Sequence, residues 1–180
     1  DEHLMVIDKP AGLAVHGGTS VAVGLIEALR AIRSHTPYLE LAHRLDRETS
    51  GCLLIAKSRA SLLGLHEMLR GEGVDKRYLA LVQGGWVGGT RTIEAGLDKG
   101  HRQAGERRVA VDEEGKESAS RFHPKRRFAV ATLVEVELLT GRMHQARVHA
   151  VHAGHPIAGD SKYGDRDFNA AMKKLGLKRL

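Results

Sequence analysis

The sequence has very little cysteine: Cys52 is the single thiol among its 180 residues. One thiol excludes an internal disulfide, and it excludes a zinc cluster built on several cysteine ligands. The absence of disulfides fits a reduced, cytosolic compartment. Aromatic residues are also scarce, with one Trp, three Tyr and three Phe. An aromatic side chain that stands beside basic residues is therefore a candidate surface for stacking a base.

No apolar run approaches the roughly 20 residues that a membrane-spanning helix needs, and the N-terminus does not resemble a signal peptide. The chain begins at Asp1 rather than at Met, so we expect a fragment or one excised domain of a longer protein. Its hydrophobic content of 42% and charged content of 28% are those of an ordinary soluble protein. A chain of 180 residues can bury a hydrophobic core within one domain.

The positive charge is unevenly distributed along the chain, whose net charge is +6. Residues 1–90 carry 10 Lys and Arg against 10 Asp and Glu, whereas residues 91–180 carry 18 against 12. A one-sided basic excess favours a polyanionic partner such as nucleic acid. The alternative is an ordinary basic surface that keeps the protein soluble, and composition alone does not decide between the two.

Apolar spacing predicts strands and helices that do not alternate regularly. Strands outnumber helices, so we expect an α+β fold with a mixed, mostly antiparallel sheet and flanking helices rather than a doubly wound fold. The stretch 86–118 is rich in glycine and charge and predicts long loops with short hairpin strands. Strands are predicted at 3–10, 52–56, 77–82, 119–123 and 129–139, and helices at about 21–33, 59–70 and 143–153.

A first charged segment, residues 43–51 (HRLDRETSG), runs directly into a predicted buried strand. In an extended stretch Arg44 and Asp46 point to the same side, because side chains alternate. Arg44 and Arg47 flank Asp46, and nearby positive charge favours the ionised form of a carboxyl group. An ionised carboxylate can act as a nucleophile or a base. The alternative is a structural ion pair in which Asp46 caps a turn.

A second segment, residues 140–149 (TGRMHQARVH), is basic and lacks a local counter-charge, because no acidic residue occurs between Glu137 and Asp160. His144 and Arg147 are three residues apart and would share a helical face that could hold phosphate or a catalytic carboxylate. The alternative is a basic helix facing solvent. A metal site is disfavoured, because the histidines lack the spacing and the adjacent Glu of the zincin pattern.

A third segment places a tyrosine beside two basic residues, Lys76 and Arg77. Tyr78 is a candidate for stacking on a base, although a tyrosine that opens an apolar strand is more often part of the core. Residues 99–127 carry nine Lys and Arg against five Asp and Glu, which suits a surface that contacts phosphate. The glycine pairs at 17–18 and 84–85 do not match nucleotide-binding fingerprints, so no nucleotide cofactor is indicated.

Together these segments resemble the pseudouridine synthases of the RluA superfamily. Residues 43–51 look like the family signature, and residues 8–12 (DKPAG), 76–82 (KRYLALV) and 140–149 agree with it in order and spacing. The likeness continues through 153–157 and 160–165, so it covers nearly the whole chain. Residues 15–18 and the helix that follows are most similar to the C type of the ribosomal large subunit pseudouridine synthases. The resemblance therefore implies isomerisation of uridine to pseudouridine in large-subunit ribosomal RNA.

The resemblance also implies roles for individual residues. Asp46 matches the aspartate that attacks the uridine, Arg147 the arginine that forms a salt bridge with it, and Tyr78 the tyrosine that packs against the target base. Arg44 matches the arginine that fills the space left by the flipped nucleotide. The family uses no cofactor and no metal, and we expect a monomer that binds no membrane. The candidate RNA contacts are Arg44, Arg47, Lys76, Arg107, Arg108, Arg142 and His144.

The chain departs from the family pattern in two ways. Ala146 stands where members commonly have a branched aliphatic residue, which should alter packing rather than chemistry. The family also continues beyond the position of Leu180, and members of this subgroup usually carry an N-terminal S4-like RNA-binding domain. We therefore expect residues 1–180 to be one catalytic domain, incomplete at its C-terminus and without the S4-like domain.

Two other functions are compatible with parts of the sequence. An RNA-binding module without catalysis would explain the basic charge, but it would make the proposed pair between Asp46 and Arg147 incidental. A metal-dependent hydrolase would use the histidines. Formation of modified product in RNA separates the first alternative from the synthase, and metal analysis of the purified protein tests the second.

Overall fold

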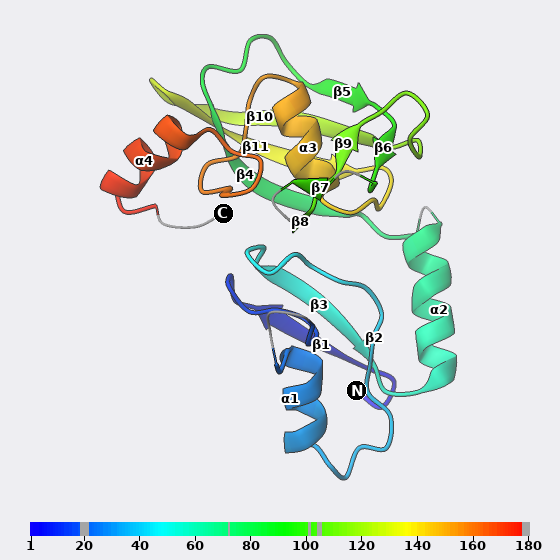
Figure 1. Ribbon diagram of the computed structural model, residues 1–180. Helices are drawn as coiled ribbons and strands as arrows, with labels where there is room; N and C mark the ends of the chain where they lie inside the picture. The colour runs from blue at the N-terminus through cyan, green and yellow to red at the C-terminus, as the bar shows by residue number, and fades with distance from the viewer. Residues whose placement is uncertain (19–21, 72, 101, 104–105, 178–180) are drawn as a thin grey trace. The chain divides into compact units, whose positions relative to one another are not determined.

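The computed structural model describes residues 1–18, 22–71, 73–100, 102–103 and 106–177 (Figure 1). Contacts between residues divide the chain into two compact units, Asp1–Val74 and Asp75–Leu180. Each unit has its own sheet and helices. That the two units form one catalytic domain stays a prediction. None of the helices within the described ranges is long and apolar enough to cross a membrane.

The first unit contains a three-stranded antiparallel sheet in the order β1-β3-β2. Strand β1 pairs with β3 along its whole length, from Leu4 opposite Ala56 to Lys9 opposite Gly51. Leu53 and Ile55 of β3 are fully buried, as alternation along a half-buried strand requires. The elements are β1 (Leu4–Lys9), α1 (Leu25–Ile32), β2 (Glu40–Leu41), β3 (Gly51–Ala56) and α2 (Arg59–Arg70).

The second unit contains a four-stranded antiparallel sheet in the order β4-β11-β10-β5. One face of this sheet packs against α3, with Phe122, Val134 and Val136 fully buried between them beside Ala150 (Figure 1). Short strand pairs β6–β9 and β7–β8 follow β5. The elements are β4 (Arg77–Gln83), β5 (Arg91–Glu94), β6 (Leu97–Asp98), β7 (Arg102–Gln103), β8 (Glu106–Arg107), β9 (Ala110–Val111), β10 (Ala119–Arg127), β11 (Ala131–Leu138), α3 (Gln145–His152) and α4 (Arg166–Lys174).

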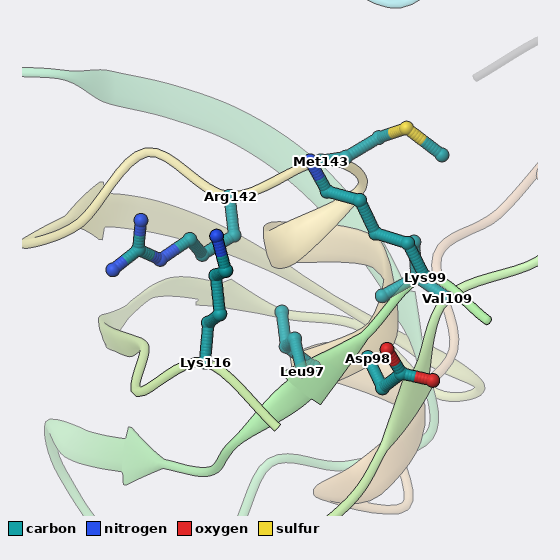
Figure 2. Close-up of a pocket in the computed structure, with 7 residues that line it drawn as sticks. All are labelled: Leu97, Asp98, Lys99, Val109, Lys116, Arg142 and Met143. Carbon is teal, nitrogen blue, oxygen red and sulfur yellow. The ribbon is translucent and has the colours of Figure 1, made fainter. Parts of the chain in front are cut away.

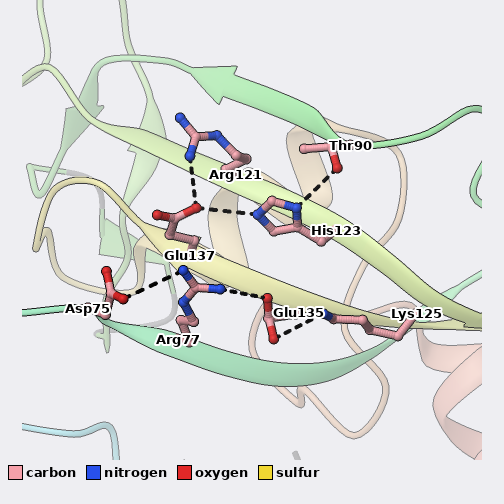
Figure 3. A network of polar contacts seen from close by, with 8 residues as sticks. All are labelled: Asp75, Arg77, Thr90, Arg121, His123, Lys125, Glu135 and Glu137. Carbon is pink, nitrogen blue, oxygen red and sulfur yellow. Dashed lines mark hydrogen bonds and ion pairs between the residues drawn. The ribbon is translucent and has the colours of Figure 1, made fainter.

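Charged side chains cover the opposite face of this sheet (Figure 3). Glu135 binds Arg77 and Lys125, each at 3.2 Å, and Glu137 binds Arg121 at 2.9 Å and His123 at 3.3 Å. Exposed ion pairs of this kind contribute little to stability. They do show which face each side chain of β4 occupies. Side chains alternate along the strand, and Arg77 lies on the charged face, so the side chain that follows it lies on the face covered by α3.

The α+β class with mostly antiparallel strands is confirmed, and every strand pair within the described residues is antiparallel. The predicted helix at 59–70 matches α2, whose N-terminus is capped by Ser58. The helix predicted at 143–153 begins later, at Gln145, because His144 adopts a left-handed conformation with φ of 55°. Strand β2 and helix α4 were not among the predicted elements.

Candidate active site

Asp46 begins a tight turn just before β3. The turn closes through the N–H of Thr49, which donates to the carbonyl oxygen of Asp46 at 3.1 Å. Exposure alternates along the residues before the turn: Arg44 is exposed, Leu45 is buried and Asp46 is half-buried. This alternation agrees with the prediction that Arg44 and Asp46 lie on the same side of the chain.

A buried ammonium group holds this turn. Lys9, at the end of β1, is fully buried, and its Nζ donates to the carbonyl oxygen of Arg47 at 3.0 Å. The same Nζ donates to the carbonyl oxygens of Pro10 at 3.0 Å and Leu13 at 2.9 Å. All three donors of the ammonium group are therefore used. Lys9 fastens the Asp46 turn to the segment that follows β1.

Two further hydrogen bonds join the same segments. The N–H of Gly12 donates to the carbonyl oxygen of Arg47 at 2.8 Å, and Nε of Arg47 donates to the carbonyl oxygen of Gly12 at 3.1 Å. The Arg47 guanidinium also lies 3.6 Å from Glu48.

Burial lowers the pKa of Lys9, and the negative charges of Glu48 and Asp46 partly oppose that effect. Lys9 thus supplies a positive charge close to the Asp46 turn.

His43, at the start of the charged segment, anchors it to β3. Its Nε2 accepts the N–H of Leu54 at 3.1 Å. Burial lowers the pKa of His43, which favours the neutral ring that can accept this bond. Sequence reasoning assigned His43 no role beyond membership of the motif, and the structure gives it the task of positioning the strand that follows Asp46.

Arg147 projects from α3 in the second unit onto a buried carboxylate. Its Nε and Nη2 each donate to an oxygen of Asp160 at 2.8 Å, so the pair is bidentate. The side chain of Asp160 is 1% exposed and that of Arg147 is 14% exposed. Burial alone would raise the pKa of Asp160, but Arg147 and the backbone N–H groups of Tyr163 and Lys162 outweigh it and hold this pKa below its usual value.

An aromatic ring covers the same guanidinium. The Arg147 carbon Cζ lies 4.9 Å from the ring centroid of Tyr163, and that of Arg108 lies 5.7 Å from it. The hydroxyl of Tyr163 accepts the N–H of Val109 at 2.9 Å and lies 2.7 Å from Nδ1 of His144. The predicted RNA contacts Arg108 and His144 therefore lie beside Arg147, although neither Asp160 nor Tyr163 was predicted to take part.

Helix α3 is fixed by a buried polar network. The ring of His149, which is fully buried, hydrogen-bonds to Ser118 at 2.9 Å and to Ser120 at 3.0 Å. Nε2 of Gln145 donates to Ser120 and to the carbonyl oxygen of Ala119, each at 2.8 Å. Burial lowers the pKa of His149 to about 4. These contacts tie the helix that carries the predicted arginine to β10.

A histidine in α3 and another that follows this helix contact other groups of the protein. His149 binds Ser120 of β10 and Ser118 just before it, and His155 lies 2.8 Å from the carbonyl oxygen of Gln83 and 4.8 Å from the ring centroid of Trp86. Within the described residues, no group of three or more His, Cys, Asp or Glu side chains could hold a metal ion.

Tyr78 lies on β4, where it is paired with Val136 of β11. It is half-buried and packs against the core that α3 covers, together with Ala146 of α3. Tyr78 and α3 therefore share one face of the sheet. The predicted RNA contact Lys76 precedes this strand, and its carbonyl oxygen accepts the N–H of Leu138 at 2.8 Å.

A pocket of about 110 Å³ lies between β6, the residue just before β9 and the turn before α3 (Figure 2). Its apolar lining consists of Leu97, Val109 and Met143, and exposed basic side chains stand at its edge. Nε of Arg142 donates to the carbonyl oxygen of Glu117 at 3.1 Å. The predicted contact Arg107 lies in β8, and its side chain falls outside the described part of the structure. The charged residues of the lining are Asp98, Lys99, Lys116 and Arg142.

A sequence profile described as RNA pseudouridylate synthase matches residues 3–152, most of the chain. The chain belongs to the RNA pseudouridylate synthase family. The matched range of this family member includes Lys9, Asp46, Tyr78 and Arg147. The predicted resemblance is thereby confirmed.

Individual relatives in this family are close in sequence. The chain is 53% identical to the ribosomal large subunit pseudouridine synthase C of Salmonella typhi, over all of the chain and 57% of the relative. It is 54% identical to the protein of that name from Haemophilus influenzae, over all of the chain and 56% of the relative. The chain thus spans a little over half the length of these curated relatives.

A solved human structure, RNA pseudouridylate synthase domain containing 1, shares the fold of this family member. The TM-score is 0.78 at 23% sequence identity, and the match covers 95% of the chain and 70% of the human protein.

Only some of the residues described above were predicted from the sequence. Asp46, Tyr78 and Arg147 were singled out, but the bidentate partner that the structure gives Arg147 is Asp160. Because Asp46 and Arg147 belong to different units, their predicted salt bridge stays a prediction. A signal for Asp160 existed, since it is the first acidic residue after the basic segment.

Proposed function

We propose that this chain carries the catalytic centre of an enzyme that isomerises uridine to pseudouridine in large-subunit ribosomal RNA. The observation that carries the proposal is Asp46, a half-buried carboxylate in a turn fastened by the buried ammonium of Lys9. This turn lies within the family match, and the relatives at 53–54% identity are ribosomal large subunit pseudouridine synthases.

The reaction exchanges one bond of the nucleotide for another. The bond between C1′ and N1 breaks, the uracil turns, and a bond between C1′ and C5 forms. C5 then loses its proton to solvent, and N1 gains one. We assign the opening attack to Asp46 as the nucleophile: the bond that its carboxylate forms to the nucleotide breaks again before pseudouridine leaves, so the carboxylate is regenerated without a cofactor or metal.

The other predicted site residues would hold and shield the base. A uridine must leave its stack to be reached, which costs a few kcal/mol and is offset by contacts in the pocket. We assign packing against the flipped base to Tyr78 and the filling of the vacated space to Arg44. Arg147 would orient Asp46 through a salt bridge that also keeps the carboxylate charged in a dry site.

Basic side chains of both units would bind the RNA backbone. We propose Arg44, Arg47, Lys76, Arg107, Arg108, Arg142 and His144 as contacts, and we add Lys99 and Lys116 because they edge the same pocket as Arg142. We further propose that the enzyme acts as a monomer in the cytoplasm.

The test is tritium release from large-subunit RNA labelled with [5-³H]uridine. Three proteins are compared. They are the 180-residue chain, a longer protein that contains this chain and has the full length of its relatives, and the Asp46→Asn variant of that longer protein. We expect the longer protein to release tritium and its variant to release none while binding RNA equally well. Release by the Asn variant would refute the role of Asp46. Binding without release by any folded protein would favour an RNA-binding module.

A further inference from the structure

The hairpin that joins β10 to β11 exposes an aromatic ring at its tip, residues 125–130 (Figure 1). All six residues of the tip are exposed. The chain has seven Phe, Tyr and Trp residues, all within the described ranges, and Phe128 alone among them is exposed, at 45%. Val130 of the tip and Val87, in the loop after β4, are also exposed. Apolar side chains that are exposed together can mark an interaction site.

Backbone hydrogen bonds fix the position of the ring. The N–H of Phe128 donates to the carbonyl oxygen of Ala131 at 2.8 Å, which closes the hairpin over Ala129 and Val130. The N–H of Gly84 donates to the carbonyl oxygen of Val130, also at 2.8 Å, so the loop after β4 supports the turn. A ring that is already held in place loses little freedom when it binds a ligand.

Arg127 joins the hairpin to the loop that carries Val87. Its Nε donates to the carbonyl oxygen of Trp86 at 2.9 Å, and its Nη2 donates to the carbonyl oxygen of Gly88. These two carbonyl groups flank Val87 in the sequence, so the exposed apolar side chains of the loop and of the tip belong to segments that are bonded to each other.

Arg126 and Lys125 differ in what they contact. The carbon Cζ of Arg126 lies 5.1 Å from the centroid of the Phe128 ring, a cation–π contact. Lys125 pairs with Glu135 at 3.2 Å (Figure 3). The tip thus offers a guanidinium that is stacked beside a partly exposed aromatic ring.

The charge around the tip has one sign along the sequence. No acidic residue occurs between Glu117 and Glu135, nor within residues 84–93 of the supporting loop. A ligand that fits this surface carries negative charge together with a flat apolar group. A nucleotide has both, since its phosphate suits Arg126 and its base can stack on a ring that arginine reinforces.

We infer that the hairpin tip binds an unpaired nucleotide of the RNA substrate other than the target uridine, with its base stacked on Phe128 and its phosphate near Arg126. The inference rests on the proposed function, which supplies the RNA. Tyr78, proposed for the target base, is paired with Val136, and Ala131 lies five residues further along β11, roughly 17 Å away. One base cannot reach both places, so the tip holds a separate nucleotide.

The experiment uses the longer protein that contains this chain, with the variants Phe128→Ala, Phe128→Tyr and Arg126→Ala. Two exposed residues of α2 provide matched controls, Leu63→Ala for the lost apolar side chain and Arg59→Ala for the lost charge. The first readout is the dissociation constant for oligocytidylate at several salt concentrations. This RNA contains no uridine, so its binding needs no turnover. The second readout is kcat and KM for tritium release from large-subunit RNA.

Phe128→Ala should weaken oligocytidylate binding roughly 5- to 100-fold, as expected for the loss of one stacked base, and its salt dependence should not change because no charge is removed. Arg126→Ala should weaken binding and also reduce the slope against the logarithm of salt concentration by about 0.7, the value for one phosphate of a single strand. Phe128→Tyr keeps the ring and should bind like the wild type, as should both α2 controls.

The kinetics should change in KM rather than in kcat. A contact away from the reacting base stabilises the bound substrate and the transition state equally, so Phe128→Ala should raise KM and leave kcat nearly unchanged. A lower kcat with unchanged KM in this variant would overturn the inference, because the ring would then act on the reacting nucleotide.

Each remaining outcome has a distinct meaning. Tritium release together with unchanged oligocytidylate binding in folded Phe128→Ala would overturn the inference and leave the proposed function intact. Weaker binding in a protein that never releases tritium would support the inference and refute the proposed function. If Phe128→Ala loses only binding to phosphatidylserine vesicles, or only self-association, the tip serves a membrane or a second copy and the inference is overturned. If Phe128→Ala does not fold, Phe128→Trp decides, because quenching of its fluorescence by oligocytidylate supports stacking and absence of quenching overturns it.

Discussion

Removing the Arg147 guanidinium should destabilise the second unit strongly, because it leaves a buried carboxylate without its ion partner. Asp160 is 1% exposed at its side chain and accepts two hydrogen bonds from Arg147. Breaking a buried pair by deleting one partner costs about 3–5 kcal/mol. For a protein of this size, that corresponds to a drop in Tm of roughly 6–20 °C. The measurement is urea unfolding of wild type and Arg147→Ala at several pH values.

The pH dependence identifies the cause. In the wild type the pKa of Asp160 is lowered despite burial, so the pair stabilises the fold fully above about pH 4 and loses that contribution as the pH falls through the folded pKa. In Arg147→Ala, burial dominates and should raise the pKa of Asp160 above its unfolded value. The difference in unfolding free energy should therefore be largest at pH 7 and shrink as acid protonates Asp160.

A second substitution tests the same reasoning without a change of pH. In the Arg147→Ala/Asp160→Asn double variant no buried charge is left unpaired, so it should recover part of the stability that Arg147→Ala loses. Equal destabilisation at pH 7 and pH 5, together with no recovery in the double variant, would refute the assignment of the loss to an unpaired Asp160.

Three further predictions concern other parts of the chain. Lys9→Met should cost about 3 kcal/mol, because it leaves buried carbonyl oxygens unsatisfied, and urea unfolding measures this. Burial lowers the pKa of His149 to about 4, so in acid the ring takes up a proton when the protein unfolds. The free energy of unfolding should therefore fall by up to roughly 3 kcal/mol between about pH 6.5 and pH 4. A His149→Asn variant should lack this pH-dependent component. Lys116→Ala and Arg142→Ala should each weaken RNA binding, and the slope of the logarithm of the binding constant against the logarithm of salt concentration should become smaller by about 0.9 for each phosphate that is no longer neutralised. Lys174→Ala on α4 is the control. An unchanged slope in the first two variants would place the RNA elsewhere.

Local signals predicted the regular elements well. Helix α2 combines an N-cap at Ser58 with apolar residues at helical spacing, and its predicted range agrees with the structure. Helix α4 also has local signals, an N-cap at Asp165 and buried Phe168 and Met172 four residues apart. Its other apolar residues are the small Ala170 and Ala171, so the hydrophobic periodicity is too weak to predict it.

The site was predictable only in part, because its supports are contacts between distant segments. Asp46 and Arg147 stand in motifs that resemble a family, whereas the ties of Lys9 to Arg47 and of Arg147 to Asp160 depend on how the chain turns back on itself. The left-handed backbone of His144 was likewise not predictable from the sequence, since only a few per cent of non-glycine residues adopt it, although histidine does so more often than most.

The fastening of the Asp46 turn by Lys9 has a consequence for the order of folding. The bond from Lys9 to the carbonyl oxygen of Arg47 joins residues 38 positions apart, and Lys9 stands opposite Gly51 where β1 pairs with β3. Closing such a loop costs chain entropy before any contact compensates for it, so non-local pairings of this kind form slowly. We therefore expect the turn to reach its final shape only as the first unit completes its sheet. A partly folded chain would present no preorganised carboxylate to RNA. Catalytic activity should therefore appear only after the first unit has folded.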